Sequence, residues 1–333
     1  MSTVTQSDEH IVAEIEAGGA RMKRVHEAAG SVIFGQEKVI EQTLITLMAG
    51  GHALLIGVPG LAKTLLVETL GTVLGMDAKR IQFTPDLMPS DIIGSEVLEE
   101  AHGGGRREFR FIKGPIFTQL LMADEINRAS PKTQSALLQA MQEHHVTVAG
   151  ERHNVPAPFH LLATQNPLEQ EGTYPLPEAQ LDRFLLQIDV DYPSLDAERR
   201  MLHATTGTTK PKLEAILTGA ELIALQQLVR VMPAPDKVVE AILALVRAAR
   251  PGEGAPEETN RLIAWGPGPR ASQALMLAVR AKAMIDGRLA PSVDDVLALA
   301  EPVLKHRMAL TFAARAEGED IGRVIARLAS TVE

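Results

Sequence analysis

The sequence predicts an α/β fold in which a parallel sheet carries helices on both faces and is followed by an all-helical second domain. Between residues 26 and 193, short apolar runs alternate with segments of helical periodicity, the pattern of a parallel sheet covered by helices. Beyond Pro193 the strand signals stop, and residues 194–333 follow helical patterns. Residues 1–25 are expected to form a separate N-terminal helical segment.

Five near-continuously apolar runs are the expected strands, because parallel strands are buried on both faces. They are residues 53–56, 81–83, 120–123, 160–164 and 184–190. The alternation breaks near residues 94–114 at a polar, Gly-rich stretch, HGGGRREFR, which predicts an insertion or hairpin. A second hairpin is expected at VTVAGERHNV, residues 146–155, where alternating residues flank a Gly turn.

Helix start signals mark the second domain. Thr218 with Glu221, and Ser292 with Asp295, each match the capping box that opens a helix and precede an apolar periodic run. Residues 249–259, ARPGEGAPEET, are expected to form an exposed linker.

The length, cysteine content and hydropathy of the chain exclude several classes of protein. The chain has 333 residues and is 45% hydrophobic, which suffices for two buried cores. It has no cysteine, which excludes disulfides, thiolate metal sites and cysteine nucleophiles and fits a reducing compartment. The N-terminus, MSTVTQSDEH, lacks the features of a signal peptide, and no run reaches the ~18 apolar residues of a membrane span. We therefore expect a soluble, cytoplasmic protein.

The charge balance argues against a nucleic-acid-binding protein. Lys and Arg number 33 against 42 Asp and Glu, a formal net charge of -9, and only 3% of residues are aromatic. Such a surface repels polyanions and offers few platforms on which bases could stack. A local basic stripe remains open as an exception. Arg106, Arg107, Arg110 and Lys113 form one candidate patch, either a solvated face or a substrate-contacting surface.

Residues 50–74, GGHALLIGVPGLAKTLLVETLGTVL, contain an apolar strand, a Gly-rich turn, Lys-Thr and a helix. This is the context of a P-loop, whose backbone N–H groups and helix N-terminus surround a phosphate. Lys63 is expected to reach the β- and γ-phosphates of ATP, and the Thr64 hydroxyl to ligate Mg²⁺. The candidate nucleotide-binding residues here are Gly57, Pro59, Gly60, Leu61, Ala62, Lys63, Thr64 and Leu65.

One position departs from the motif, which asks for Gly immediately before Lys where this chain has Ala62. Alanine restricts the backbone but keeps the N–H donor. Pro59 has no N–H, so the useful donors are expected from residue 60 to residue 65. The alternative is an ordinary strand-turn-helix with an exposed Lys63.

A carboxylate pair follows the predicted strand in QLLMADEINR, residues 119–128. Parallel strands end at the same edge of a sheet, which would bring Asp124 and Glu125 beside the P-loop. Asp124 is expected to hold Mg²⁺ through a water, and Glu125 to orient the attacking water. The alternative is that both acids merely cap the following helix. In HLLATQNP, Asn166 follows another apolar run, from which its amide can reach the γ-phosphate.

The combination of GVPGLAKT, ADEINRAS, ATQNP, GTYPLPEAQLDRF and GPGPRAS, in this order, resembles the MoxR family of AAA+ ATPases of the helix-2-insert clade. The resemblance runs from Ile33 to the last helices. It implies an AAA+ core with a helical lid, and residues 94–114 match the insertion that marks the clade.

The resemblance also implies roles for particular residues. Asn166 is the sensor of the γ-phosphate, Arg183 an arginine finger, and Arg270 a second sensor on the lid. FGQE, with Phe34, Gly35 and Gln36, lines the adenine pocket. Arg183 could instead pair with Asp182 or Glu178, Arg270 could lie on a solvated helix, and the role of Arg128 stays open. A finger that serves a neighbour's nucleotide implies a homo-oligomeric ring, a hexamer in this family.

The function implied by the resemblance is chaperone-like remodelling or activation of a partner, with a von Willebrand factor A domain protein as adaptor. The alternatives are a nucleic-acid motor, a metal-chelatase motor subunit and a nucleotide-gated binding module without turnover. The histidines His144, His145 and His153 are expected to be structural, since adjacent His side chains point apart and no ligand spacing completes a metal site.

Overall fold

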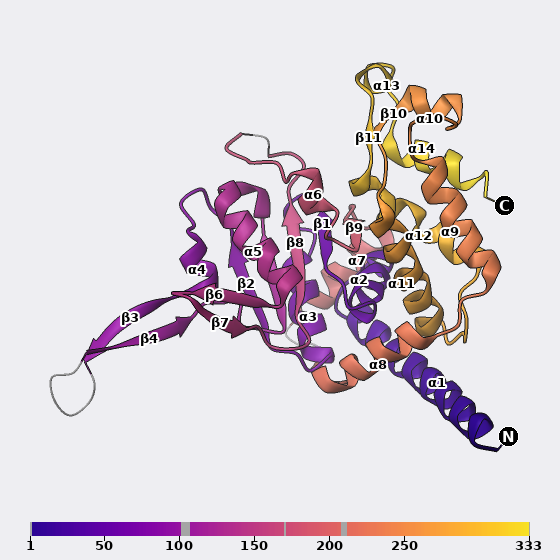
Figure 1. Ribbon diagram of the computed structural model, residues 1–333. Coiled ribbons are helices and arrows are strands. Elements are labelled where there is room, and N and C mark those ends of the chain that lie inside the picture. The colour runs from indigo at the N-terminus through magenta and orange to yellow at the C-terminus, as the bar shows by residue number, and fades with distance from the viewer. Residues whose placement is uncertain (1, 101–106, 170, 208–211, 333) are drawn as a thin grey trace.

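The structure is a computed structural model that describes residues 2–100, 107–169, 171–207 and 212–332. Figure 1 shows three regions: a central α/β core, a mostly helical region beside it, and a long β-hairpin that projects from the opposite side of the core. We call the helical region from residue 195 onward the lid. The two termini lie on the lid side of the molecule (Figure 1).

A five-stranded parallel sheet forms the centre of the core, in the order β2-β5-β8-β1-β9. All five predicted strands are present, with ends shifted by a few residues. They are β1 (Ala53–Ile56), β2 (Ala78–Gln82), β5 (Leu120–Asp124), β8 (His160–Gln165) and β9 (Leu186–Asp189). Since the strands are parallel, β1, β5 and β8 end at the same edge of the sheet. The predicted P-loop, the acidic pair and Asn166 lie at that edge.

Helices cover both faces of the sheet. Along β1, Ala53 and Leu55 pack into one hydrophobic cluster and Leu54 into another, so the strand is buried on both sides. This explains why its sequence is continuously apolar. The helices of the core are α2 (Glu37–Met48), α3 (Lys63–Val73), α4 (Pro89–Ile93), η1 (Ile126–Arg128), α5 (Pro131–Glu143) and α6 (Glu178–Leu181).

Two hairpins extend from the core, at the positions that the sequence predicts. The insertion is β3 (Gly94–Glu100) with β4 (Arg107–Lys113), and the second hairpin is β6 (His145–Val148) with β7 (Glu151–Asn154). The ring of Phe111 stacks on His153 with centroids 4.0 Å apart, which joins the two hairpins. Arg106 of the predicted basic patch lies outside the described residues.

The lid consists mainly of helices, and both predicted capping boxes are present, at Thr218 with Glu221 and at Ser292 with Asp295. One feature corrects the expectation of an all-helical lid. A short antiparallel ribbon pairs β10 (Ile263–Trp265) with β11 (Ala309–Leu310), and strands of three and two residues are too short to produce a period-2 pattern. The helices are α7 (Leu195–Thr205), α8 (Gly219–Val231), α9 (Asp236–Ala248), α10 (Glu257–Leu262), α11 (Pro269–Ile285), α12 (Val293–Leu304), η2 (Lys305–Arg307), α13 (Phe312–Ala316) and α14 (Ile321–Ala329).

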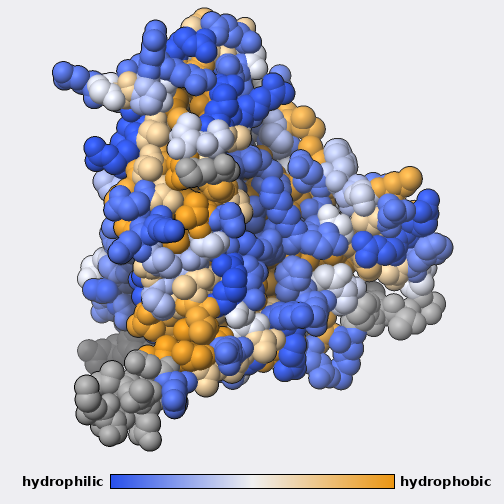
Figure 2. Space-filling model, turned by 90° about the vertical axis from the view of Figure 1, so that its right-hand side faces the viewer, coloured by the Kyte–Doolittle hydropathy of each residue, from blue (hydrophilic) through white to orange (hydrophobic). Residues whose placement is uncertain are grey.

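Helix α1 (Ser2–Gly30) runs without a break into the region where the sequence predicts the core to begin. Its buried side chains Ile15, Met22 and Val25 join the cluster shared by core and lid. Seen from the lid side, the surface is a mosaic in which hydrophobic patches interrupt a largely hydrophilic covering (Figure 2). Among the described residues, no helix combines the length and apolar character that a membrane span requires.

Candidate nucleotide site

The predicted P-loop connects β1 to α3 at the carboxyl edge of the sheet. Gly60 and Ala62 have φ angles of 85° and 58°, and Ala62 adopts the left-handed conformation directly before α3. The Lys63 ammonium donates to the carbonyl oxygens of Gly57 and Val58, the latter at 3.1 Å. Burial lowers the pKa of Lys63, while the carboxylates of Asp124 and Glu125 oppose that change. The loop therefore surrounds the Lys63 ammonium, in the manner of a phosphate-binding loop.

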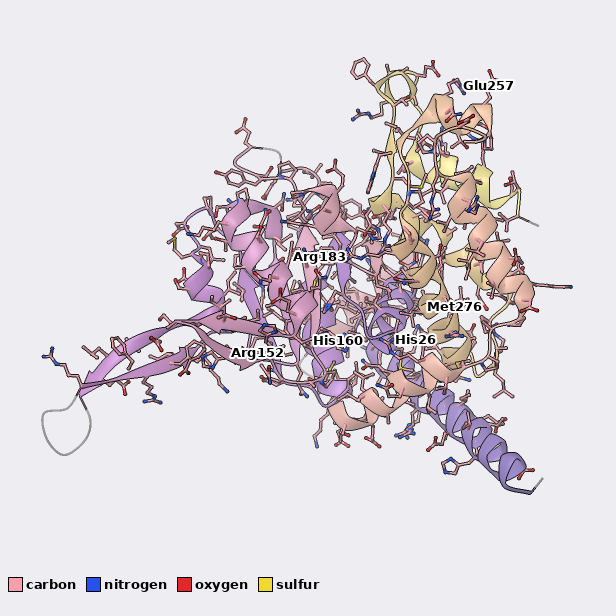
Figure 3. All side chains as sticks on the ribbon, viewed as in Figure 1. His26, Arg152, His160, Arg183, Glu257 and Met276 are labelled. Carbon is pink, nitrogen blue, oxygen red and sulfur yellow. The ribbon has the colours of Figure 1, made fainter. Side chains whose placement is uncertain are left out.

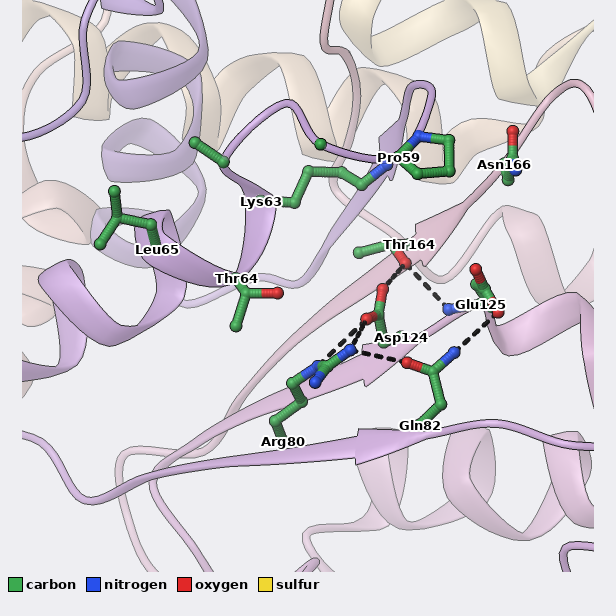
Figure 4. A pocket seen from close by; sticks show the side chains of 12 residues that line it. Pro59, Lys63, Thr64, Leu65, Arg80, Gln82, Asp124, Glu125, Thr164 and Asn166 are labelled. Carbon is green, nitrogen blue, oxygen red and sulfur yellow. Dashed lines mark hydrogen bonds and ion pairs between the residues drawn. The ribbon is translucent and has the colours of Figure 1, made fainter. Parts of the chain in front are cut away.

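A cavity of about 440 Å³ opens beside this loop (Figure 4). It brings together residues from the loop after β1 and the start of α3, and from β2, β5 and β8 with the residues that follow β5 and β8. Most of the predicted P-loop residues line it, together with the acidic pair and Asn166. The lining residues are Pro59, Gly60, Ala62, Lys63, Thr64, Leu65, Arg80, Gln82, Asp124, Glu125, Thr164 and Asn166.

The acidic pair is fixed by Thr164 of β8. Oδ1 of Asp124 accepts a hydrogen bond from the Thr164 hydroxyl at 2.5 Å, and the Glu125 backbone N–H donates to the same hydroxyl oxygen at 2.9 Å. Glu125 has a φ of 55°, a left-handed conformation that is strained for a residue with a side chain. Such strain gathers at functional sites, and Glu125 lines the cavity.

The helix-capping alternative for these two acids is wrong. Ser130 caps α5, its hydroxyl accepting from the Thr133 backbone N–H. Glu125 precedes the short η1 helix without making a side-chain cap. Instead, its Oε2 accepts from Nε2 of Gln82 at 2.7 Å and from Nη1 of Arg128 at 3.0 Å.

Arg80 and Gln82 of β2 are site residues that the sequence analysis missed. The Arg80 guanidinium contacts Asp124 and also donates to Oε1 of Gln82 at 2.7 Å, so a chain of polar contacts links Arg80, Gln82 and Glu125 (Figure 4). In the parallel register, Gln82 lies opposite Asp124. The signal in the sequence is weak: Arg80 and Gln82 stand on either side of Ile81, so a strand would place both polar side chains on one face.

Asn166 follows β8 and is 6% exposed. Its Oδ1 accepts from the Leu168 backbone N–H at 3.1 Å, which fixes the amide at the wall of the cavity. The predicted position near a γ-phosphate is therefore compatible with the geometry.

The oxygen atoms at this site suit Mg²⁺. Thr64 and Asp124 supply hard oxygen donors on the same cavity, and no group of three or more His, Cys, Asp or Glu among the described residues could hold a metal by itself. Mg²⁺ in nucleotide sites takes one or two protein oxygens and completes its shell with phosphates and water. The residues present fit a metal that arrives with a nucleotide.

Arg183 and Arg270 lie elsewhere, beside a second cavity of about 270 Å³ between core and lid (Figure 3 labels Arg183). Nη1 of Arg183 donates to the Leu138 carbonyl at 2.8 Å, and its buried Nε has no hydrogen-bond partner within the described part of the chain. Arg270 donates to Asp182 at 3.4 Å. In its own chain, neither arginine lines the P-loop cavity.

The FGQE loop also lies off the cavity. Gly35 has a φ of 71°, and a Cβ built there would be 2.5 Å from the Cβ of Ala197, so the close approach requires glycine. Nε2 of Gln36 donates to the Asp191 carbonyl at 2.7 Å. The loop thus packs on the segment that joins core to lid. Phe34, Gly35, Gln36, Gly57 and Leu61 are the predicted nucleotide-binding residues that do not line the cavity.

The three histidines of the second hairpin region have the structural roles that the sequence suggests. His144 ends α5, His145 pairs with Glu143 at 3.4 Å, and His153 stacks on Phe111.

Two family models match the chain. Residues 52–186 match the ATPase family associated with various cellular activities (AAA), and residues 257–328 match the AAA lid domain. The first range contains the whole P-loop cavity. The second contains Arg270 and most of the lid helices.

Relatives cover nearly all of the chain. It is 43% identical to Chaperone MoxR1 of Mycobacterium tuberculosis, over 90% of this chain and 79% of that protein, and 33% identical to MoxR of Paracoccus denitrificans, over 88% and 89%. A crystal structure of a candidate ATPase from Cytophaga hutchinsonii superposes with a TM-score of 0.90 at 36% identity, covering 100% of this chain and 99% of that one. With its P-loop core and lid, this chain belongs to the MoxR family of chaperone-like AAA ATPases.

Proposed function

We propose that this protein hydrolyses ATP in the P-loop cavity and uses the free energy to remodel or activate a partner protein. The observation that carries the proposal is the convergence of Lys63, Asp124, Glu125 and Asn166 on one cavity. A phosphate-binding lysine, a metal-binding carboxylate, a water-orienting carboxylate and an amide are the parts that phosphoryl transfer to water requires.

Each residue has a distinct role in this proposal. Backbone N–H groups between residues 60 and 65 and the Lys63 ammonium hold the phosphates. Thr64 and Asp124 hold Mg²⁺, which when bound neutralises charge on the phosphate oxygens. Glu125 accepts a hydrogen bond from the attacking water and orients it, while Asn166 contacts the γ-phosphate.

The position of Arg183 and Arg270 supports a ring. Both side chains line the cavity between core and lid, and neither lines the P-loop cavity of the same chain. Arg80, which does line the P-loop cavity, is engaged with Asp124 and Gln82. A planar guanidinium suits the charge spread over a transferring phosphoryl group. We therefore assign Arg183 to the nucleotide of a neighbouring subunit and Arg270 to the role of second sensor on the lid. A hexameric ring is the assembly that the resemblance to the family implies.

A von Willebrand factor A domain protein is the adaptor that we propose, because the motif resemblance to the MoxR family implies one. Affinity capture from the native host with a Glu125→Gln variant held in its ATP state, followed by mass spectrometry, should recover the adaptor and the client. Recovery of neither, with the ring verified, would contradict this partner assignment.

The first experiment separates binding from turnover. Lys63→Ala should lose ATP affinity because it removes a positive charge from the phosphates, whereas Glu125→Gln should bind ATP and fail to hydrolyse it. Binding is measured by titration with a fluorescent nucleotide and turnover by phosphate release. Equal loss of binding in both folded variants would remove Glu125 from the chemistry.

The second experiment tests the shared site. Arg183→Ala should bind ATP nearly normally and hydrolyse it slowly, since a finger acts on the transition state. Mixing it with Glu125→Gln protein under conditions of subunit exchange should restore part of the activity, at interfaces that pair an intact Glu125 with an intact Arg183. No recovery despite verified exchange would show that Arg183 does not act across subunits.

A nucleic-acid motor is the second candidate, because the insertion hairpin carries basic side chains away from the core. Two of these basic side chains have partners within the protein. Arg110 pairs with Glu99 at 3.2 Å, and the Lys113 ammonium lies 5.3 Å from the Phe117 ring centroid. ATP turnover should therefore not respond to DNA or RNA. Salt-sensitive binding that stimulates turnover and disappears on neutralising Arg110 and Lys113 would instead support the motor.

A further inference from the structure

The η2 turn of the lid inserts a buried arginine into the core. Arg307 is 2% exposed, and its five N–H donors meet five acceptors. Nε donates to Oδ1 of Asp182 at 2.9 Å. The other four bonds go to the carbonyl oxygens of Asp182, Phe184, Leu185 and Val303.

Four of these five bonds go to the three residues that flank Arg183. Asp182 precedes Arg183 in the turn between α6 and β9, and Phe184 and Leu185 follow it. Arg307 therefore donates hydrogen bonds to the backbone on both sides of Arg183, the proposed finger. Its fifth bond, to the Val303 carbonyl, ties the same guanidinium to α12 of the lid.

His306 adds a second lid contact to this turn. Its Nε2 lies 3.0 Å from the Phe184 carbonyl, which also accepts from Arg307. Burial, with the nearby positive charge of Arg307, lowers the pKa of His306 well below its usual value. The ring is therefore neutral, and Nε2 must carry the hydrogen that it donates.

Arg307 stays charged in this setting. Burial lowers its pKa to about 10, against the opposing attraction of Asp182. Oδ2 of Asp182 faces Nη1 of Arg270 at 3.4 Å, so a single carboxylate bridges the two lid arginines.

The Arg183 side chain itself makes few polar contacts with the described residues. Within residues 2–100, 107–169, 171–207 and 212–332, the Arg183 side chain makes one hydrogen bond, to the Leu138 carbonyl. Its direction consequently depends on the conformation of the turn from residue 182 to residue 185, which is the segment that Arg307 fixes.

We propose that Arg307, assisted by His306, is a positioning residue for Arg183: it makes the placement of the finger depend on the position of the lid. This inference rests on the proposed role of Arg183. A change in the lid that moves η2 would then move the finger at the neighbouring nucleotide. Lysine cannot replace Arg307, because one ammonium has three donors at a single point where the guanidinium serves five acceptors in a plane.

The test is a double-substitution cycle on ATP turnover by the full-length assembled protein. Arg307→Lys should lower kcat about 10- to 100-fold, since a misplacement of about 1 Å at a reacting group can cost about 10²-fold. The KM for ATP should change by less than about threefold, because Arg307 lies outside the P-loop cavity. In an Arg183→Ala background, Arg307→Lys should cause no further loss.

Lys305→Met is the matched control. It removes the neighbouring lid-to-core ion pair, between Lys305 and Asp189, and leaves every acceptor of Arg307 in place. Its kcat should stay within about twofold of wild type, as expected for an ion pair with an exposed partner. A loss as large as that of Arg307→Lys would overturn the inference, since any weakening of the lid contact would then suffice.

The outcomes separate this inference from the proposed function. Normal turnover by Arg183→Ala would refute the finger itself. Slow Arg183→Ala with normal Arg307→Lys, or losses that multiply in the double variant, would overturn only the role of Arg307. Should Arg307→Lys fail to fold, His306→Leu removes one donor to the same turn. His306→Leu should lower kcat by a smaller factor than Arg307→Lys, and it should lower kcat no further in the Arg183→Ala background. No loss of kcat in the single variant, or a loss that persists in the Arg183→Ala background, would also refute the inference.

Discussion

The Arg80 guanidinium donates from both Nε and Nη2 to one oxygen of Asp124, Oδ2, at 3.1 and 2.6 Å. The other oxygen, Oδ1, accepts from Thr164. Both oxygens of the proposed metal-binding carboxylate thus have protein partners. A cation that binds Oδ2 of Asp124 must share that oxygen with the guanidinium of Arg80, whose side chain is 48% exposed.

Arg80→Met should lower the Mg²⁺ concentration needed for half-maximal nucleotide binding by about two- to fivefold. The pair is partly exposed, so its loss is worth at most about 1 kcal/mol. Titration of Mg²⁺ against protein and a fluorescent nucleotide checks this. Arg128→Met, which removes a partner of Glu125 and leaves Asp124 untouched, is the control and should show no shift. A higher Mg²⁺ requirement in Arg80→Met would mean that Arg80 helps to hold the nucleotide.

Ala62→Gly should raise the free energy of unfolding by about 0.5–1 kcal/mol, because Ala62 adopts a left-handed conformation that glycine takes without strain. Nucleotide affinity should be unchanged, since the N–H remains. Urea denaturation and nucleotide titration measure the two quantities. Ala149→Gly, with a φ of 49° in a hairpin turn far from the P-loop in sequence, should give the same stabilisation. A destabilised Ala62→Gly would show that the methyl group packs favourably.

His52 and His160 lie at the amino-terminal edge of the sheet, opposite the P-loop. Nδ1 of His52 accepts from the Leu161 backbone N–H at 2.9 Å, and Nδ1 of His160 lies 2.8 Å from the Gly51 carbonyl. Nε2 of His160 accepts from the Gln226 amide at 3.0 Å. Burial is the main cause that lowers the pKa of His52 to about 3 and of His160 to about 4, and both rings are neutral at pH 7.

These pKa values predict acid sensitivity. In the unfolded chain, both histidines take up protons below pH ~6.5, whereas in the folded chain His160 stays neutral down to about pH 4 and His52 down to about pH 3. The free energy of unfolding should therefore be highest above pH 6.5 and fall as pH drops toward 4, by about 1.4 kcal/mol per pH unit for each such histidine. His160→Gln should remove about one proton from this slope, measured by urea denaturation across the pH range. An unchanged slope would contradict a low pKa for His160.

The sequence by itself determined the local elements and most of the residues that line the P-loop cavity. Continuous apolar runs identified the five parallel strands, since burial on both faces leaves no polar face to alternate. The spacing of glycines, Lys63 and Thr64 identified the phosphate loop, because its backbone geometry depends on neighbouring residues. Asp124, Glu125 and Asn166 were predicted because each stands at the end of a strand or just after it, and parallel strands end at the same edge of the sheet.

Only the tertiary structure decided which side chains meet across the sheet and between the domains. Arg80 and Gln82 reach the acidic pair because β2 lies beside β5 in one particular register, and no pattern within β2 specifies that neighbour. Arg307 forms hydrogen bonds with the turn at Asp182, which lies 125 residues earlier in the chain. Its sequence context, KHRM, is that of an ordinary basic helix end. Long-range contacts of this kind depend on how the lid packs against the core, and packing is a property of the whole chain and not of a segment.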